Sequence, residues 1–173
     1  MKAQLPRRPT KENPLLYYTG VGSRNTPAHI LDLMTKLAVK LFQQQYVLRS
    51  GGAKGVDSAF EKGASWYEIY YANDATTESM ELAGQYHPKW DACKEWARKL
   101  HGRNAFQVLG DDLRTPSKFV LCWTPDGAIN HRERSITTGG TGTAISIASA
   151  YNIPVYNFQR YDHYMIALKW ING

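Results

Sequence analysis

The sequence predicts an α/β fold: a Rossmann-like, doubly wound and mainly parallel sheet with helices on both faces. Three observations predict it. Short apolar runs alternate with longer amphipathic segments along the chain, the first apolar run ends in glycine, and the segment after it is apolar on one helical face. Such alternation is typical of parallel strands joined by right-handed helical crossovers. In this architecture ligands bind beyond the carboxyl ends of the strands, where the strand order reverses.

The first part of the chain contains three predicted strands and two predicted helices. The run LLYYTG (15–20) predicts a buried strand, and Thr26-Pro27 predicts a helix start with Thr26 as N-cap and Pro27 at the first helical position. Apolar residues at steps of three and four then predict a helix face on the sheet: Ile30, Leu33, Met34, Leu37, Ala38 and Leu41. The next predicted elements are a strand over 46–50, a helix over 56–65 and a strand over 67–72.

The second part begins with an insert over about 73–116, in which 73–79 (NDATTES) is predicted as loop and 90–100 as helix. The elements predicted after the insert are a strand over 118–123 (KFVLCW), a long polar loop over 124–138, a buried helix over 142–152, a strand over 153–158 and a closing helix over 164–171. We therefore expect one domain over 15–173, preceded by a flexible or loosely docked arm over 1–14.

Composition limits the classes of function. The chain has 173 residues and a formal net charge of +6, a balance that suits nucleic acids, nucleotides or other polyanions. No apolar run approaches the ~18 residues that a membrane span needs, and no apolar stretch follows the basic N-terminal residues as in a secretory signal. Cys93 and Cys122 are too few for a disulfide framework and lack zinc-ligand spacing. We expect a cytoplasmic protein with no metal site and no cofactor.

Three glycine-rich segments stand where phosphate-binding loops would stand: GVGSR (20–24), SGGAKG (50–55) and TGGTGT (138–143), the last reached through 124–127 (TPDG). Parallel strands exit at one edge of a sheet, so these loops are expected to meet there. Helix N-termini offer unpaired N–H groups and partial positive charge, and glycine lets an anion approach them. The candidate ligand-binding residues are Gly20, Gly22, Ser23, Arg24, Ser50, Gly51, Gly52, Lys54, Gly55, Asp57, Thr124, Asp126, Gly139, Gly140, Thr141, Gly142 and Thr143.

None of the three segments matches the dinucleotide fingerprint GxGxxG or the Walker A pattern. This excludes an ordinary NAD enzyme and a P-loop NTPase. Each loop taken alone is equally typical of a plain strand-to-helix turn. Their occurrence after three strands of one predicted sheet is what favours a ligand site.

The ordered segments YYTGVGSRNTP (17–27), YVLRSGGAKGVDSAFEKGA (46–64) and TGGTGTAISIASAYNIPVYN (138–157) resemble the SLOG superfamily. This Rossmann-like group contains the DNA-processing protein DprA and the LOG-type nucleotide phosphoribohydrolases, and the similarity is greatest to its small single-domain, DprA-like members of phages and bacteria. The resemblance covers 15–72 and 118–158. It implies nucleotide or phosphate binding by the glycine loops and a homo-oligomer, a dimer or larger.

One departure from the LOG pattern concerns the reaction. LOG enzymes carry an acidic pair after the third glycine segment, whereas this chain has Ala-Ile-Ser at 144–146. Three other carboxylates are candidates for catalysis. Asp57 and Glu61 share one helical face, and Asp126 follows the strand over 118–123. Alternatively Glu61 is a solvated helix residue, and Asp57 caps the helix or binds a ribose hydroxyl.

Three functions remain open on the sequence. The first is binding of a nucleotide or a nucleotide-derived signal, which the protein senses or sequesters. The second is an N-glycosidase (phosphoribohydrolase) reaction on nucleoside 5′-monophosphates. The third is DprA-like binding of single-stranded DNA. His131, Arg132 and Arg134, before the third glycine segment, form either a mobile flap that grips phosphate or a solvated polar loop.

Overall fold

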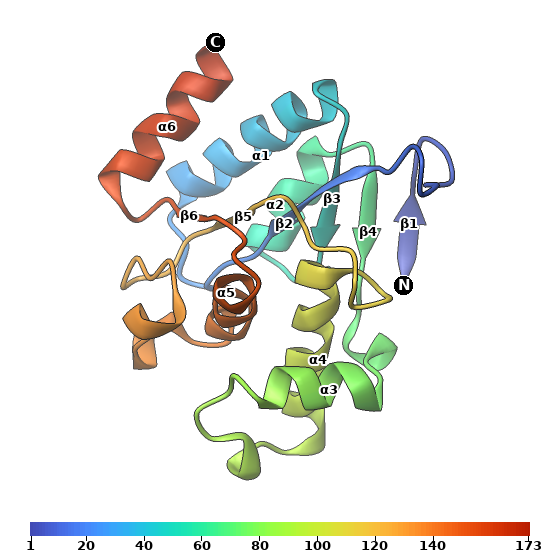
Figure 1. Ribbon diagram of the computed structural model, residues 1–173. Helices are drawn as coiled ribbons and strands as arrows, with labels where there is room; N and C mark the ends of the chain where they lie inside the picture. Colours follow the sequence, from blue (N-terminus) through green and yellow to red (C-terminus); the bar gives the residue numbers. More distant parts are fainter.

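The computed structural model describes residues 1–173 as one six-stranded sheet with helices packed on both faces (Figure 1). The strand order is β1-β4-β3-β2-β5-β6, and every neighbouring pair is parallel except β1 with β4. The strands are β1 (Lys2–Gln4), β2 (Leu16–Gly20), β3 (Tyr46–Ser50), β4 (Tyr67–Ile69), β5 (Val120–Cys122) and β6 (Val155–Asn157). The predicted α/β class with a mainly parallel, Rossmann-like sheet is confirmed.

Six α-helices and four short 3-10 turns connect the strands. The helices are α1 (Ala28–Gln43), α2 (Val56–Gly63), α3 (Thr77–Gly84), α4 (Glu95–Leu109), α5 (Thr141–Ala150) and α6 (Tyr161–Asn172). The turns are η1 (Ala72–Asp74), η2 (Trp90–Ala92), η3 (His131–Glu133) and η4 (Ile136–Thr138). No helix combines the length and the apolar character that a membrane crossing requires.

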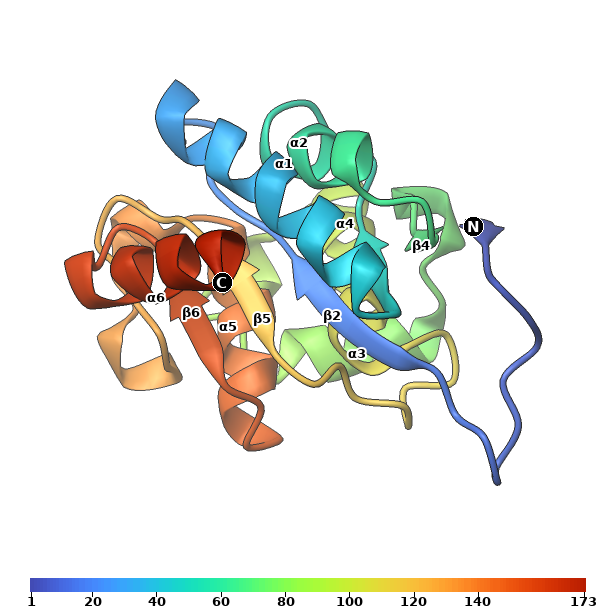
Figure 2. The ribbon, with the colours of Figure 1, turned by 90° about the horizontal axis from the view of Figure 1, so that it is seen from above.

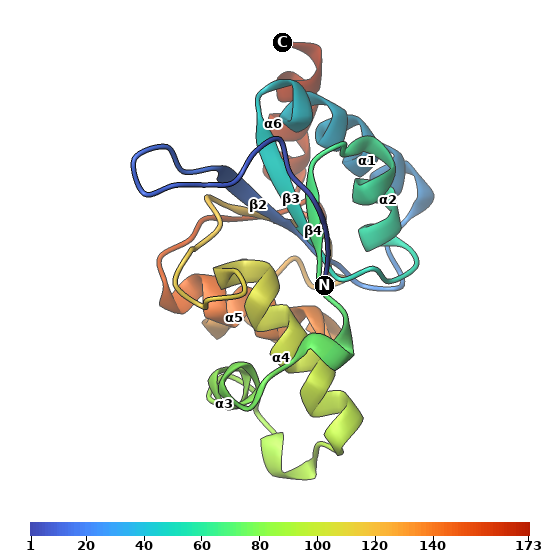
Figure 3. The same ribbon diagram turned by 90° about the vertical axis from the view of Figure 1, so that its right-hand side faces the viewer.

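Two apolar cores hold these layers together. One core joins α1, α2 and α6 to one face of the sheet around Tyr18, Leu48 and Leu121. The other joins α4 and α5 to the opposite face around Val120 and Cys122. Figure 3 shows the same division, with α3 outside α4 and away from the sheet, and Figure 2 shows α1 and α6 on the near side of the molecule. The chain therefore covers one face on its way from β2 to β4 and the other on its way from β4 to β6.

The strand order reverses between β2 and β5. β2 pairs with β3 on one side, where Thr19 lies opposite Arg49, and with β5 on the other, where Thr19 lies opposite Val120. The chain leaves β2 for α1 on one face and reaches β5 from α4 on the other. This is the switch point at which doubly wound sheets bind ligands.

Several element boundaries differ from the sequence prediction by a few residues, and α1, α3 and α4 begin differently from what it expected. α1 begins at Ala28 with Pro27 in the N-cap position, and the Thr26 hydroxyl donates a hydrogen bond to the Ser23 carbonyl instead of capping α1. α3 begins inside the segment predicted as loop, because the Thr76 side chain accepts from the Ser79 N–H and caps it. The helix predicted over 90–100 is the 3-10 turn η2 followed by the longer α4.

The N-terminal arm contributes an element that the sequence did not predict. Residues Lys2–Gln4 form β1, which pairs antiparallel with β4 so that Lys2 lies opposite Ile69. The terminal ammonium of Met1 lies 2.6 Å from Asp74 Oδ1. Three residues carry too little pattern to be recognised as a strand, and the unpaired edge of β4 supplies the hydrogen-bonding partner.

Arg49 anchors the central strands beneath the glycine loops. Its side chain is 2 % exposed, and its Nε lies 3.2 Å from Glu68 Oε1 on the neighbouring strand β4. Its Nη1 donates to the Thr115 carbonyl at 2.5 Å, and its guanidinium stacks on the Tyr17 ring at 3.9 Å. The buried guanidinium thus contacts an aromatic ring on β2, a carboxylate on β4 and a backbone carbonyl in the segment before β5.

We expect Arg49→Met to lower the free energy of unfolding by about 3–5 kcal/mol, because the Glu68 carboxylate then stays buried without its cation. Urea denaturation measures this loss. The double variant Arg49→Met/Glu68→Gln should regain part of it. Lys36→Met is the matched control: it breaks the exposed pair with Asp32, which is worth at most about 1 kcal/mol. Equal losses in Arg49→Met and in the control would contradict the account.

Candidate functional site

The first glycine loop lies against the end of β5 and the start of α2. The Val21 N–H donates to the Leu121 carbonyl at 3.1 Å and the Ser23 N–H to the Trp123 carbonyl at 3.0 Å, so the chain beyond β2 continues along β5. A Cβ at Gly22 would come within 2.6 Å of Val56 Cγ2, on the first residue of α2. Glycine at 22 therefore lets the start of α2 and the end of β5 close around the first loop.

Helix α4 of the insert joins the second and third glycine loops. Arg103 Nη1 donates to the Gly51 carbonyl at 2.7 Å, and Asn104 Nδ2 donates to the Gly140 carbonyl at 3.2 Å. The two side chains also contact each other, since Arg103 Nε lies 3.2 Å from Asn104 Oδ1. The three glycine segments thus meet at one edge of the sheet, as the strand directions predicted.

The glycines divide into two groups. A Cβ at Gly20 would meet the Phe60 ring at 2.5 Å, so Gly20, like Gly22, serves the packing of α2 on the sheet. By contrast, a Cβ at Gly55, Gly139 or Gly140 would have no other atom within 4 Å. These three stand directly before α2 and α5, and their surroundings leave space for a ligand at both helix starts.

Backbone N–H groups at these two helix starts are free. The N–H groups of Val56 and Asp57 at α2, and of Gly140 and Thr141 at α5, make no hydrogen bond within the protein. Such orphan donors are what a helix N-terminus offers to an anion. Arg24 and Lys54 are exposed on the loops before α1 and α2.

Several predicted ligand residues are already engaged by the protein. The Ser50 hydroxyl donates to Glu61 Oε1 at 2.6 Å. Thr124 is fully buried between Asp126, to which its hydroxyl donates at 2.7 Å, and the amide of Asn157. The Thr143 hydroxyl lies 2.9 Å from His101 Nδ1. These side chains hold the loops in shape.

Asp126 organises the long loop after β5. Its carboxylate accepts hydrogen bonds from the hydroxyls of Thr124, Ser135 and Thr138 and from the Ala128 N–H. Burial alone would raise the pKa of Asp126, but these donors outweigh it and lower the pKa to about 2. A carboxylate so well satisfied and so acidic suits a structural role better than proton transfer.

Asp57 has the opposite character. It lies in the first turn of α2, is 9 % exposed, and accepts one hydrogen bond from the Ala53 N–H at 3.1 Å. Burial raises the pKa of its carboxyl to about 6, although the positive charge of Arg103 works against the rise. Asp57 and Arg103 flank Gly51: a Cβ there would meet Arg103 Nη1 at 2.6 Å and Asp57 Oδ2 at 3.0 Å. Of Asp57 and Asp126, Asp57 is the one whose pKa is raised toward the range that acid–base chemistry uses.

The polar segment before α5 is tied to that helix. Arg134 Nη1 donates to the Tyr86 carbonyl at 2.7 Å and to Ser146 Oγ at 3.0 Å, and His131 Nδ1 lies 2.7 Å from the same hydroxyl. Arg134 also lies over Gly142, where a Cβ would collide with its guanidinium. Of the three residues predicted as flap or solvated loop, two are therefore docked on Ser146.

Arg103 and Asn104 were missed by sequence reasoning. They lie in the insert, in no recognisable motif, and only the tertiary packing of α4 brings them to the glycine loops. A cavity of about 490 Å³ also lies in the insert, between α3, η2 and α4, and not over the glycine loops. A phosphate needs converging amides more than depth, so we place the candidate anion site at the loops.

Comparison of the chain with protein-family models, with curated proteins and with solved structures found no match.

We expect Asp57 to contribute a fall in the free energy of unfolding as the pH rises from about 4 to about 6, because the folded protein holds the Asp57 proton more tightly than the unfolded chain does; His101, whose pKa burial lowers to about 4, contributes a rise over the same range. Between the unfolded and the folded pKa of Asp57, the Asp57 contribution changes by at most about 1.4 kcal/mol per pH unit. Asp57→Asn should lose this part of the pH dependence, as measured by urea denaturation near pH 4.5 and pH 7. Asp32→Asn, an exposed control on α1, should keep it. Identical pH profiles for the wild type and Asp57→Asn would contradict the assignment.

Proposed function

We propose that the protein binds a nucleotide or a nucleotide-derived signal at the edge formed by the three glycine loops. One observation carries the proposal: two helix starts with free N–H groups face space left open by Gly55, Gly139 and Gly140. Arg103 and Asn104 link the loops that lead to those two starts, through hydrogen bonds to the Gly51 and Gly140 carbonyls. In this proposal, phosphate oxygens accept hydrogen bonds from the amides of Val56, Gly140 and Thr141.

Electrostatics support an anionic ligand. The partial positive charges of two helix N-termini add to the guanidinium of Arg103. Arg24 and Lys54 can reach phosphate from solvent, and the chain carries a formal net charge of +6. The motifs that resemble the SLOG superfamily contribute these same loops, which makes a nucleotide a better candidate than an unrelated polyanion.

Asp57 supports one alternative, an N-glycosidase reaction on nucleoside 5′-monophosphates. The reaction adds water across the bond between base and ribose, giving free base and ribose 5-phosphate. A buried carboxyl with a pKa near 6 exchanges a proton near neutral pH, as a general acid or base must. The Ala-Ile-Ser segment at 144–146 supplies no carboxylate, so binding without turnover remains our first proposal.

The direct test is to identify the small molecule that copurifies with the protein, by mass spectrometry after denaturation. Calorimetric titration with nucleoside 5′-monophosphates, with inorganic phosphate and with a single-stranded oligonucleotide then ranks the ligand classes. A nucleotide recovered unchanged supports binding. Free base and ribose 5-phosphate support the glycosidase. Tight, salt-sensitive binding of the oligonucleotide alone would replace both with DNA binding.

Gly140→Ala is the sharpest probe of the site. Its φ of −62° is allowed for alanine and no atom lies within 4 Å of the new methyl group. We expect the free energy of unfolding to change by less than about 1 kcal/mol. Affinity for the phosphate-bearing ligand should fall at least about tenfold, because the methyl group blocks approach to the amides of α5.

Ser149→Ala, near the other end of α5, is the matched control and should keep full affinity. Should Gly140→Ala bind the ligand as tightly as the control does, the phosphate is not held at the start of α5.

A further inference from the structure

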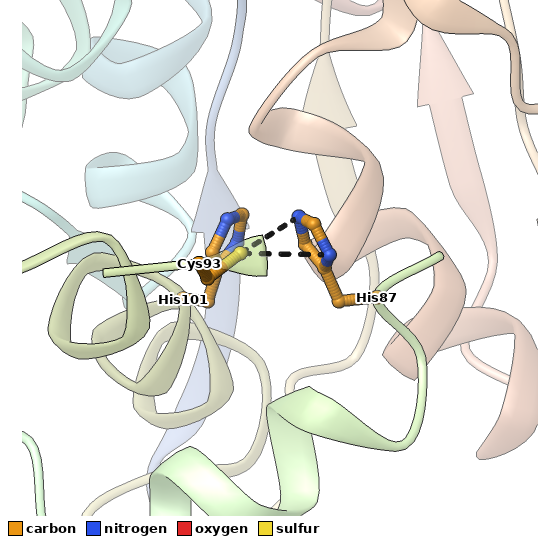
Figure 4. A group of neighbouring side chains, drawn as sticks. All are labelled: His87, Cys93 and His101. Carbon is orange, nitrogen blue, oxygen red and sulfur yellow. Dashed lines mark hydrogen bonds between the residues drawn. The ribbon is translucent and has the colours of Figure 1, made fainter. Parts of the chain in front are cut away.

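Three potential metal ligands from the insert lie together although they are separated in the sequence. His87 precedes η2, Cys93 follows it, and His101 lies on α4; one ligand atom from each falls within 4.8 Å of the others. Figure 4 shows the three side chains gathered around one point. Cys93 Sγ lies 3.7 Å from His87 Nε2 and 3.8 Å from His87 Nδ1, and the two imidazole rings are 4.5 Å apart between centroids.

These separations suit a tetrahedral site for a thiophilic cation. Zinc binds sulfur at about 2.3 Å and imidazole nitrogen at about 2.0–2.1 Å, which places a sulfur and a nitrogen ligand about 3.6 Å apart. Two imidazoles and one thiolate form a donor set that favours zinc over the hard cations magnesium and calcium. Few rearrangements are therefore needed for one ion to reach all three side chains.

The neighbours of the cluster already orient its rings. His101 Nδ1 lies 2.9 Å from the Thr143 hydroxyl, which leaves His101 Nε2 to face the cluster. A partner of this kind on the second ring nitrogen is typical of histidines that bind metal. The Cys93 thiol donates to the Lys89 carbonyl at 3.5 Å, and the Lys89 N–H donates to His87 Nδ1 at 3.0 Å. The loop between His87 and Cys93 is thus folded back on itself, with Lys89 bonded to both side chains.

We propose that His87, Cys93 and His101 form a zinc-class metal site, with a fourth coordination position left for water or another exogenous ligand. On binding, the Cys93 thiol gives up its proton to solvent and His101 donates the lone pair of Nε2. His87 binds through Nδ1, whose lone pair is released from the hydrogen bond with the Lys89 N–H, while His87 Nε2 keeps its proton. Cys93 also lines the cavity of about 490 Å³, together with Trp90, Glu81 and Glu95. That cavity gives an ion and its water a path to the cluster.

The metal would fasten the insert beside the glycine loops. It would join the loop that holds His87 and Cys93 to α4, and α4 carries Arg103 and Asn104 one turn or less beyond His101. The His101–Thr143 hydrogen bond extends the link to the first turn of α5. The proposed metal site uses only His87, Cys93 and His101, so it does not depend on whether the glycine loops bind a nucleotide.

The test uses cobalt(II) as a spectroscopic substitute for zinc. The full-length protein is stripped with a chelator, dialysed and titrated with cobalt(II). We expect a thiolate-to-cobalt charge-transfer band that saturates at one equivalent, with the intense visible bands of a tetrahedral ion, and its loss on adding zinc. Cys93→Ser should abolish the charge-transfer band. His29→Ala, an exposed histidine on α1, is the matched control and should leave it unchanged.

Chemical labelling of the wild-type protein is a second measurement, which does not depend on whether Cys93→Ser folds. Cys93 is partly exposed and Cys122 is buried, so iodoacetamide should label Cys93. Zinc should protect Cys93 from labelling, as read by mass spectrometry. No charge-transfer band in the wild type, a band that persists in Cys93→Ser, or labelling of Cys93 that zinc does not slow would each overturn the proposal.

Discussion

The parallel pairing of β2 with both β3 and β5 is the constraint on which the rest of the structure depends. Because β2 has a parallel neighbour on each side, three strands end at one edge and the chain must cross to opposite faces to reach them. Gly22 lets the turn after β2 close against Val56 and the Trp123 carbonyl. The edge then consists of turns followed by helix starts, where free backbone amides occur together with the exposed side chains of Arg24 and Lys54.

The insert is part of this edge, because its helix α4 contacts two of the glycine loops. The middle of α4 supplies Arg103 to the second glycine loop and Asn104 to the third, so a helix from outside the recognisable motifs links two of the loops. Arg103 also lies beside Asp57, where its charge opposes the effect of burial on the carboxyl. A ligand at the edge would therefore contact Arg103, a cation that belongs to the insert. A change that makes the insert more rigid would also make the glycine loops more rigid, because α4 is hydrogen-bonded to them.

The sequence was sufficient for the sheet and for the place of the loops, because strand-and-helix alternation and glycine turns are local patterns. It predicted α1 to within a residue or two at its start, since the spacing from Ile30 to Leu41 is regular. The sequence did not predict the features that depend on contacts between segments far apart in the chain. β1 forms because the edge of β4 is unpaired, and Thr124 and Thr143 turn inward to Asp126, Asn157 and His101. The meeting of His87, Cys93 and His101 follows from the fold of a loop whose spacing matches no common ligand motif.

The central claim is that free amides at the starts of α2 and α5 together hold a phosphate group. Two-dimensional amide NMR of the protein, titrated first with inorganic phosphate and then with nucleoside 5′-monophosphates, tests it most directly. The account predicts that the resonances of Gly55, Val56, Gly140 and Thr141 shift together, with one common dissociation constant. Shifts confined to residues outside these two helix starts, or no shifts with any of these ligands, would contradict it.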